Sequence, residues 1–296
     1  VESICRVLRQ EGCQIAARTY RAWRRRSASA RDTSDAVLLN VLHDLVGTPE
    51  GLYGRRKMTA WLRREGHQVG AGRVDRLMRV AGMNGVRRGR PVRTTVPAKD
   101  GCRAGDLLNR DFTAAAPNTK WVADFTYVRT WAGFVYVAFV LDCYSQRILA
   151  WHAATAKTTP LVLTPLRIAL WDRDRHGHPV QPGELIAHSD AGSQYTSLRF
   201  AEHLAAEGIA ASIGTVADAY DNALMECVIG LYKTECITTT IFHNGPYKTI
   251  ADVEYATAGW VEWYNNRRLH SSLAMTTPAE YETAYYAALN RELAPT

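Results

Sequence analysis

Three acidic residues occupy positions where an isolated carboxylate would be costly. Asp124 lies within the apolar and aromatic run WVADFTYV, Asp190 follows the apolar segment 185–187, and Glu226 lies in the stretch DNALMECVIGLYKTE. A carboxylate in such a segment must be paired, hydrogen-bonded or bound to a metal ion. Mg²⁺ prefers oxygen ligands, and two such ions about 4 Å apart can promote phosphoryl transfer. The three residues are therefore candidates for a metal site, whereas on composition alone purely structural carboxylates are the commoner case.

The segments that would position these carboxylates are typical of a mixed sheet with helices on its faces. Alternating and continuous apolar runs predict a meander of three antiparallel strands over 121–128, 133–141 and 147–152. Helical spacing and further short apolar runs then predict, in order, a helix, a strand, a helix, a strand and two helices, over 158–174, 185–188, 197–207, 210–213, 219–236 and 252–265.

Two positional arguments follow from these elements. Ligands bind at the carboxyl ends of strands in open α/β sheets, so Asp190 is expected at the edge of a site. The spacing of four and seven residues places Asn222, Glu226 and Lys233 on one face of their helix. The three acidic residues can therefore converge only if the predicted strands and helix pack together.

The positive charge of the chain is concentrated in its first third. The 296 residues carry a formal net charge of +7. Residues 1–100 hold 21 Lys and Arg against 9 Asp and Glu, and the remainder holds 15 against 20. Arginine matches phosphate geometry and displaces counterions from nucleic acid. This asymmetry indicates a DNA-binding region, the alternative being a solvated basic surface.

The N-terminal third reads as short helices. A helical unit over 1–28, broken near Gly12, is followed by a predicted linker over 29–35 and a helix beginning at Asp35. Two further helices, over 56–64 and 71–80, are separated by the turn GHQVG, which is the helix-turn-helix pattern. The alternative is a small basic helical bundle without a groove-reading role. One face of the second helix carries a row of arginines that are candidate DNA contacts, Arg73, Arg76 and Arg79.

Two further segments are basic. The stretch RRGRPVRTTVPAKDGCRAG within 87–105 has the Pro, Gly and Arg content of a linker that can follow phosphates. Near the C-terminus, polar, aromatic and basic residues cluster at Tyr264, Asn265, Arg267, Arg268 and His270. They can contact DNA, with Arg267 and Arg268 as the cationic candidates. The alternative is a helix end packed through a Trp260/Trp263 stripe.

Several other classes of protein are excluded or disfavoured. The six cysteines form no C-x-x-C pair, and no Cys/His spacing resembles a zinc site, so reduced thiols are expected. His176 and His178 are expected in a loop rather than on a metal. The chain has no P-loop motif, no secretory signal pattern and no apolar run long enough to span a membrane. A cytoplasmic protein without membrane contact is expected.

Five ordered motifs resemble a known family. WVADFTYV, LDCYSQRILAW, HSDAGSQYTS, DNALMECVIGLYKTE and WYNNRRLHSSLAMTTPAEY are similar to the catalytic domain of retroviral-integrase-type DDE transposases. They resemble most closely the second-frame product (OrfB) of the IS-three family of bacterial insertion sequences. YGRRKMTAWLRREGHQVGAGRVDRLMRVAGM resembles the helix-turn-helix segment of that family. The family spaces its second aspartate and its glutamate by 35 residues, and 35 residues separate Asp190 from Glu226.

The resemblance implies a fold and a division of the chain. The fold is a ribonuclease-H-like mixed five-stranded sheet flanked by helices, preceded by an all-α helix-turn-helix region. The expected parts are a helical DNA-binding region over 1–92 with the helix-turn-helix at about 48–84, a basic linker over 93–117, a catalytic domain over 118–285 and a tail over 286–296.

The resemblance also implies residue roles. Asp124, Asp190 and Glu226 match the catalytic, metal-binding positions, and Lys233 matches a basic position used against DNA. Asn222 and Ser189 shape the site, although helix capping and turn formation explain them equally well. Asp142 is expected to be structural.

The function expected from this resemblance is metal-dependent cleavage and joining of DNA strands at insertion-sequence ends. Two Mg²⁺ (or Mn²⁺) ions are expected per site, with double-stranded DNA as substrate and at least a dimer acting on it. The chain does not begin with Met. A first-frame product of the same element is expected as a fused or separate partner. Two alternatives remain: a DNA-binding regulator without catalysis, and a structure-selective nuclease of the same fold.

Overall fold

The computed structural model describes residues 1–87, 108, 111–190, 194–195, 197–213 and 222–293. Its centre is one five-stranded sheet with the strand order β3-β2-β1-β4-β5. The strands are β1 (Lys120–Thr130), β2 (Gly133–Asp142), β3 (Ile148–Ala154), β4 (Ile186–Ser189) and β5 (Ala210–Ile213). β1, β2 and β3 pair as an antiparallel meander, whereas β4 joins β1, and β5 joins β4, in parallel. The predicted strands and the mixed sheet are confirmed.

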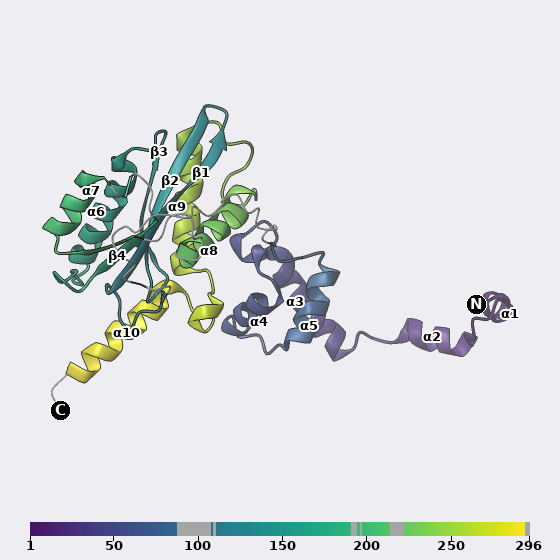
Figure 1. Ribbon diagram of the computed structural model, residues 1–296. Helices are drawn as coiled ribbons and strands as arrows, with labels where there is room; N and C mark the ends of the chain where they lie inside the picture. Colours follow the sequence, from purple (N-terminus) through teal and green to yellow (C-terminus); the bar gives the residue numbers. More distant parts are fainter. Residues whose placement is uncertain (88–107, 109–110, 191–193, 196, 214–221, 294–296) are drawn as a thin grey trace.

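Helices cover both faces of this sheet (Figure 1). On one face lie α6 (Thr159–Arg175) and α7 (Leu198–Ala206), packed through Leu161, Leu166 and Phe200. On the other face lie α8 (Ala223–Leu231) and α9 (Ile250–Asn266), packed through Met225 and Trp260. The alternation of β1 divides its side chains between the two cores: Val122 and Val128 belong to the α8/α9 side, and Trp121 to the α6/α7 side.

The predicted helix over 219–236 differs in its second half. After α8 the chain continues as a π-helical turn, η3 (Tyr232–Ile237). This wider turn contains Lys233, so the α-helical spacing from Glu226 is interrupted before that lysine is reached. Tyr232 and Cys236 point into the core, where Tyr232 packs on Phe139 and Trp260.

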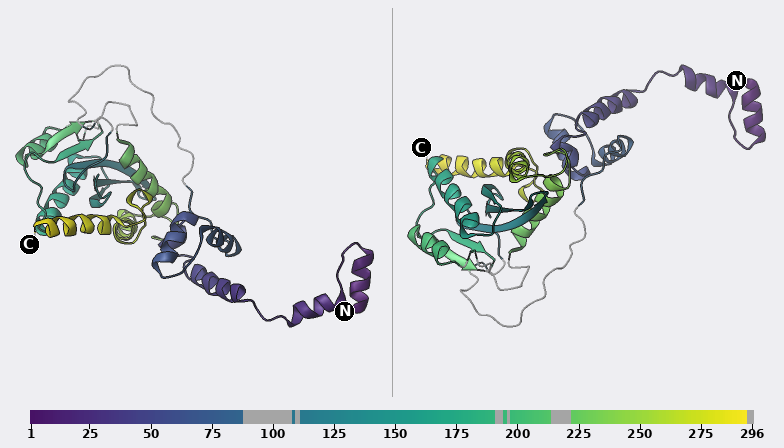
Figure 2. Two further views of the ribbon diagram at one scale, coloured as in Figure 1. Left: turned by 90° about the horizontal axis from the view of Figure 1, so that it is seen from below. Right: turned by 90° about the horizontal axis from the view of Figure 1, so that it is seen from above.

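The N-terminal third is helical, as expected. α1 (Glu2–Gln10) and α2 (Ala17–Arg25) form an arm that extends away from the rest of the molecule (Figure 2). α3 (Ala30–Asp44), η1 (Pro49–Leu52), α4 (Arg55–Arg64) and α5 (Ala71–Val80) then pack together. The predicted linker over 29–35 is wrong, because Ser29 caps α3 in a reciprocal capping box with Asp32 and the helix begins at Ala30.

The C-terminal segment is α10 (Pro278–Leu293), preceded by the short turn η4 (Ser271–Leu273). The expected start of the tail at 286 therefore falls inside a helix. α10 is joined to the sheet by a buried ion network in which Arg173 of α6 lies between Glu282 and Asp142. Asp142 also accepts bonds from the Asn118 backbone and the Trp121 indole, which confirms its structural role.

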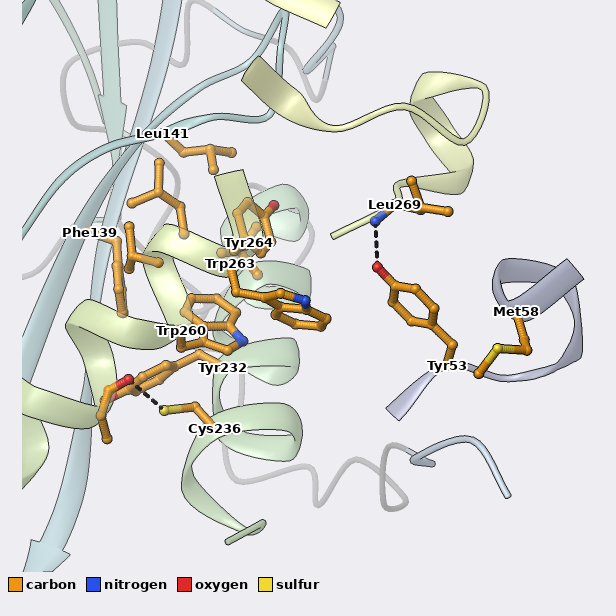
Figure 3. Close-up of a cluster of buried hydrophobic side chains, with 14 of the residues drawn as sticks. Tyr53, Met58, Phe139, Leu141, Tyr232, Cys236, Trp260, Trp263, Tyr264 and Leu269 are labelled. Carbon is orange, nitrogen blue, oxygen red and sulfur yellow. Dashed lines mark hydrogen bonds between the residues drawn. The ribbon is translucent and has the colours of Figure 1, made fainter. Parts of the chain in front are cut away.

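The helix-turn-helix region is docked on the sheet domain through one continuous core. Met58 and Leu62 of α4 belong to the same buried cluster as Trp260 and Trp263 of α9. Figure 3 shows the Tyr53 hydroxyl bonded to the backbone of Leu269, with Met58 beside the Tyr53 ring. The indole of Trp263 donates to Glu50 at 3.0 Å and stacks on Tyr53 at 6.0 Å between ring centres. We call this contact between residues 50–62 and residues 260–269 the seam.

Most of the predicted linker over 93–117 lies outside the described residues. In the part of the chain that the structure describes, no helix combines the length and apolar character needed to cross a bilayer.

Candidate active site

The first two acidic residues are brought together by the pairing of β1 with β4. The parallel register aligns Ala123 with Ser189 at the carboxyl end of β4. Asp124 follows Ala123 in β1, and Asp190 directly follows the end of β4, so the register makes these two residues neighbours. On the opposite side of β1, Asp124 pairs with Phe139 of β2 in the antiparallel register. A backbone N–H donated by Phe125 at 2.7 Å holds the Asp124 carboxylate.

The third acidic residue comes from the first turn of α8. Glu226 lies there, where the positive end of the helix dipole favours an anion. Asn222 occupies the N-cap position, but its side chain makes no capping bond. Instead its amide donates to the carbonyl of Ala123 at 3.3 Å, which ties the start of α8 to β1 beside Asp124. The capping explanation for Asn222 is therefore wrong, and a positioning role remains a prediction.

The electrostatics couple Asp124 to the other two carboxylates. Burial raises the pKa of Asp124 to about 7, and repulsion from Asp190 and Glu226 adds to this shift. The Phe125 N–H and the Lys233 ammonium act in the opposite direction. Because the charges of Asp190 and Glu226 both raise the pKa of Asp124, both carboxylates lie close enough to interact with it electrostatically. The site therefore has an excess of negative charge that a cation would relieve.

The residues fit a hard divalent cation in chemistry. All three side chains offer oxygen donors, which Mg²⁺ and Mn²⁺ accept. The side-chain oxygen of Asn222 is buried in the same region, and the structure shows no hydrogen-bond partner for it. Among the described residues, no group of three or more His, Cys, Asp or Glu side chains is arranged to hold an ion as it stands.

Lys233 lies at the border of this site. Its pKa is lowered by partial burial, while the charge of Asp124 acts to raise it. Its ammonium nitrogen lies 5.0 Å from the ring centre of Tyr127 on β1. Lys233 is thus held between the acidic site and an exposed aromatic side chain.

The arginines predicted to contact DNA on α5 are partly used within the protein. Arg73 and Arg76 both bind Asp35 of α3, whose pKa is lowered by these bonds. Arg79 pairs with Asp75 one turn earlier on α5, and its side chain is 74% exposed. Arg73 and Arg76 therefore hold α3 against α5, and Arg79 is the most accessible of the three.

Most of the polar and aromatic side chains within residues 264–270 are buried in the protein and do not project into solvent. Arg268 is 4% exposed, and its guanidinium donates hydrogen bonds to both carboxylate oxygens of Glu235. The prediction that Arg268 contacts DNA is not supported by this position, because its charge is buried and already paired. Tyr264 and His270 are also buried, whereas Arg267 is half-exposed and pairs with Glu262 and Glu50. The alternative of a helix packed through Trp260 and Trp263 is confirmed.

Sequence reasoning missed a group of cations at the seam. A cleft of about 620 Å³ lies between α4 and η3 and is lined by Arg55, Arg56 and Lys57. The structure shows no ion pair for these three side chains among the described residues. Burial and the nearby Arg268 lower the pKa of Lys57 to about 7. The run RRK at the start of the helix predicted over 56–64 was the available signal, but its link to the sheet domain depends on tertiary packing.

The histidine expectation can also be compared with the structure. His176 lies at the end of α6, and His178 stacks on Tyr286 of α10 at 3.6 Å between ring centres. Neither histidine belongs to a possible metal cluster within the described residues.

A mixed five-stranded sheet with Asp124 on its central strand and Glu226 on a covering helix is the arrangement expected for the integrase type of nucleic-acid enzyme. Models of the family described as Integrase core domain match residues 114–219 and 207–278, and a model described as HTH-like domain matches residues 37–91. These matches cover the region of all three carboxylates and the helices of the seam.

Curated relatives extend the likeness over nearly the whole chain. A Mycobacterium tuberculosis protein of the insertion sequence element IS986/IS6110 is 45% identical over 280 residues, which are 95% of this chain and 99% of that protein. The transposase for insertion sequence element IS629 of Shigella sonnei is 44% identical and aligns over 89% of this chain and 85% of its own length. The chain belongs to the IS-three family of insertion-sequence transposases.

The solved structures that match this chain include a simian T-cell lymphotropic virus intasome in complex with the PP2A regulatory subunit B56 gamma. The matching intasome chain is 14% identical to this protein, with a TM-score of 0.48. The alignment covers 78% of this chain and 70% of the intasome chain. The HTLV-2 integrase catalytic core domain in complex with magnesium is 16% identical, has a TM-score of 0.42, and covers 57% of this chain and 98% of that chain.

Proposed function

We propose that this protein cuts and joins DNA strands at the ends of an insertion sequence, using Asp124, Asp190 and Glu226 as one catalytic site. The observation that carries the proposal is the local geometry: the register of β1 and β4 aligns the residues just before Asp124 and Asp190, and the start of α8, which carries Glu226, is bonded to β1 through Asn222 and Ala123. Burial raises the pKa of Asp124, and the charges of Asp190 and Glu226 add to this shift, which supports a shared site. Family membership supports the same activity.

The residues would perform this chemistry as a cation-holding cage. When bound, two Mg²⁺ or Mn²⁺ ions would supply activation of a water or 3′-hydroxyl and stabilisation of the departing 3′-oxygen. Asp124 would release its proton as the cation binds, because opposite charge lowers the pKa of an acid. Asn222 would fix the distance between α8 and β1, and Lys233 would contact a phosphate beside the acids.

DNA is the proposed partner of both halves of the molecule. The basic N-terminal third would bind the duplex at the element end, with Arg79 the most accessible cation of α5. The seam fixes this region against the sheet domain, so the bound end would enter the acidic site in a defined orientation. Arg267 remains a candidate backbone contact because it is half-exposed.

A multimer and a first-frame partner complete the proposal. Joining two element ends in one event needs at least two copies of the site. The N-terminal arm exposes apolar side chains of α1, Ile4, Val7 and Leu8, and its α2 buries none of its residues. An arm of this kind suits contact with a first-frame product or a second copy. Because the proposed substrate is bacterial DNA, the place of action would be the cytoplasm, at the nucleoid.

A strand-transfer assay tests the proposal. A DNA end labelled at one 5′ terminus is incubated with the full chain, Mg²⁺ and a target plasmid. Labelled products longer than the substrate are expected, and they should be lost in Glu226→Gln. Only shorter products would indicate a structure-selective nuclease, and binding without any product would indicate a regulator. Full joining by Glu226→Gln would overturn the assignment of the site.

A further inference from the structure

The hairpin of β1 and β2 extends beyond the rest of the sheet. β4 pairs with β1 only through Ala123, whereas β1 and β2 continue as partners as far as Thr130 and Gly133. Figure 1 shows this hairpin projecting past the end of β4. The far half of the hairpin therefore starts at Asp124 and leads away from the acidic site.

The far half of the hairpin exposes three large aromatic side chains. Tyr127 is 55% exposed, Phe134 49% and Trp131 73%. Tyr127 and Phe134 share one face of the hairpin and meet edge to face, with ring centres 5.3 Å apart. Isolated exposed apolar side chains are ordinary, whereas contiguous ones mark interaction sites, so the contact between Tyr127 and Phe134 is the informative feature.

The tip of this hairpin is held in place. The backbone N–H groups of Trp131 and Ala132 donate to the carbonyls of Tyr247 and Lys248, each at 3.0 Å. The hydroxyl of Tyr247 donates in turn to the carbonyl of Cys236 in η3. The Trp131 ring is thus presented by a fixed backbone, which lowers the entropy cost of binding.

Cations accompany the aromatic rings. The ammonium nitrogen of Lys248 lies 5.5 Å from the ring centre of Trp131, and that of Lys233 lies 5.0 Å from Tyr127. Arg129 stands opposite Phe134 in the strand register. The described part of the chain provides no ion pair for any of these three cations. We call the set Tyr127, Arg129, Trp131, Phe134, Lys233 and Lys248 the hairpin surface.

We propose that the hairpin surface binds the unpaired bases and backbone of a DNA strand next to the phosphate that is cut. This inference rests on the proposed function, because β1 leads directly from Asp124 to Tyr127, whose ring lies under the Lys233 ammonium. Bases inside a duplex are stacked on one another, so aromatic side chains stack most readily on unpaired bases, and cations follow the phosphates between them. A duplex hides its base faces, and a second copy of the same surface would bring like charges together.

The test compares binding of two probes by the full chain in EDTA, where no strand is cut. One probe is a single-stranded oligonucleotide with 2-aminopurine, and the other is a blunt duplex. Trp131→Ala and Tyr127→Ala should each weaken single-strand binding about tenfold and reverse the quenching of 2-aminopurine, with duplex binding changed less than about twofold. Trp131→Phe should keep most of the affinity.

Trp171→Ala is the matched control. Trp171 is also an exposed tryptophan with a cation over its ring, but it lies on α6, away from the hairpin. It should leave both affinities unchanged. Unchanged single-strand affinity in Trp131→Ala, an equal loss on the duplex, or a loss of self-association without a loss of quenching would each overturn the inference. Because this readout needs no catalysis, a wild-type protein that binds unpaired DNA but never joins ends would contradict the proposed function alone.

Discussion

The hydroxyl of Tyr53, in the helix-turn-helix region, accepts a hydrogen bond from the backbone N–H of Leu269 at 3.0 Å. The same hydroxyl donates to the carbonyl of Arg267 at 3.2 Å. Burial raises the pKa of Tyr53 to about 12, so it stays protonated and able to donate at neutral pH. One side chain therefore satisfies two backbone groups across the seam.

Tyr53→Phe should destabilise the protein by about 1–3 kcal/mol, because it keeps the ring but leaves the buried N–H of Leu269 unpaired. Urea unfolding followed by tryptophan fluorescence measures this loss. Tyr255→Phe is the control, since Tyr255 is 74% exposed and should change the free energy of unfolding by less than about 0.5 kcal/mol. An equally small effect for Tyr53→Phe would show that its bonds do not hold the seam.

Glu282→Gln should cost about 3–5 kcal/mol of stability, because Arg173 is 1% exposed and would keep a buried charge without its main partner. Glu280→Gln on the same helix is the matched control. Its ion pair with Arg64 is exposed, so about 1 kcal/mol or less is expected. Thermal unfolding distinguishes the two variants, and equal losses would contradict a special role for the buried network.

The buried network around Glu282 and Arg173 also predicts how the stability of the protein changes at low pH. Its partners lower the pKa of Glu282 to about 2 from an ordinary value of 4.5. A lowered acid pKa contributes stability that is present above pH 4.5 and is lost as the pH falls toward 2. Wild type should therefore lose stability over that window more steeply than Glu282→Gln does.

The carboxyl group of Asp124 should change the stability of the protein with pH in the opposite direction. Its ordinary pKa of 3.8 is raised to about 7 in the folded, metal-free protein. Between about pH 4 and pH 7 the unfolded chain has released this proton while the folded chain keeps it, so stability falls as the pH rises. Asp124→Asn should therefore match wild type near pH 4 and exceed it near pH 8, by up to about 4 kcal/mol. Urea titrations in EDTA at the two pH values measure the difference, and a constant difference would contradict the shift.

The cations at the seam predict a change in salt dependence. Arg55 and Arg56 line the cleft without ion pairs among the residues that the structure describes. If both contact phosphates, the double variant Arg55→Ala/Arg56→Ala should reduce the slope of log affinity against log salt by about 2 on duplex DNA. Arg199→Ala, on α7, should leave the slope unchanged. An unaltered slope in the double variant would show that the cleft does not follow the DNA backbone.

The sequence predicted most of the framework because its signals are local. The alternation in WVADFTYV and the continuous apolar run GFVYVAFVL located β1 and β2 within two residues of their ends. The 35-residue spacing and the motif around Glu226 indicated the carboxylates, and the strand register then explained how Asp124 and Asp190 meet. What local patterns could not give was tertiary pairing. Nothing beside Arg268 in the chain indicated that Glu235 neutralises it, or that Asp35 holds Arg73.

The expectations that failed have physical reasons. The segment 29–35 is polar enough to read as a linker, but the capping box between Ser29 and Asp32 satisfies the first backbone donors and starts α3 there. The helical spacing that joined Glu226 to Lys233 assumed a regular α-helix, whereas η3 is a π-turn. Such a turn has no clear sequence signature, and here it carries the residue that links the acids to the hairpin surface.

Anomalous X-ray scattering from crystals of the full chain grown with Mn²⁺ tests the central claim most directly. The account predicts manganese density in contact with the carboxylates of Asp124 and Asp190, with Glu226 turned toward the same ions. Density should disappear in Asp124→Asn crystals treated in the same way. Manganese bound only elsewhere, or the three carboxylates held apart at saturating Mn²⁺, would contradict a shared catalytic site.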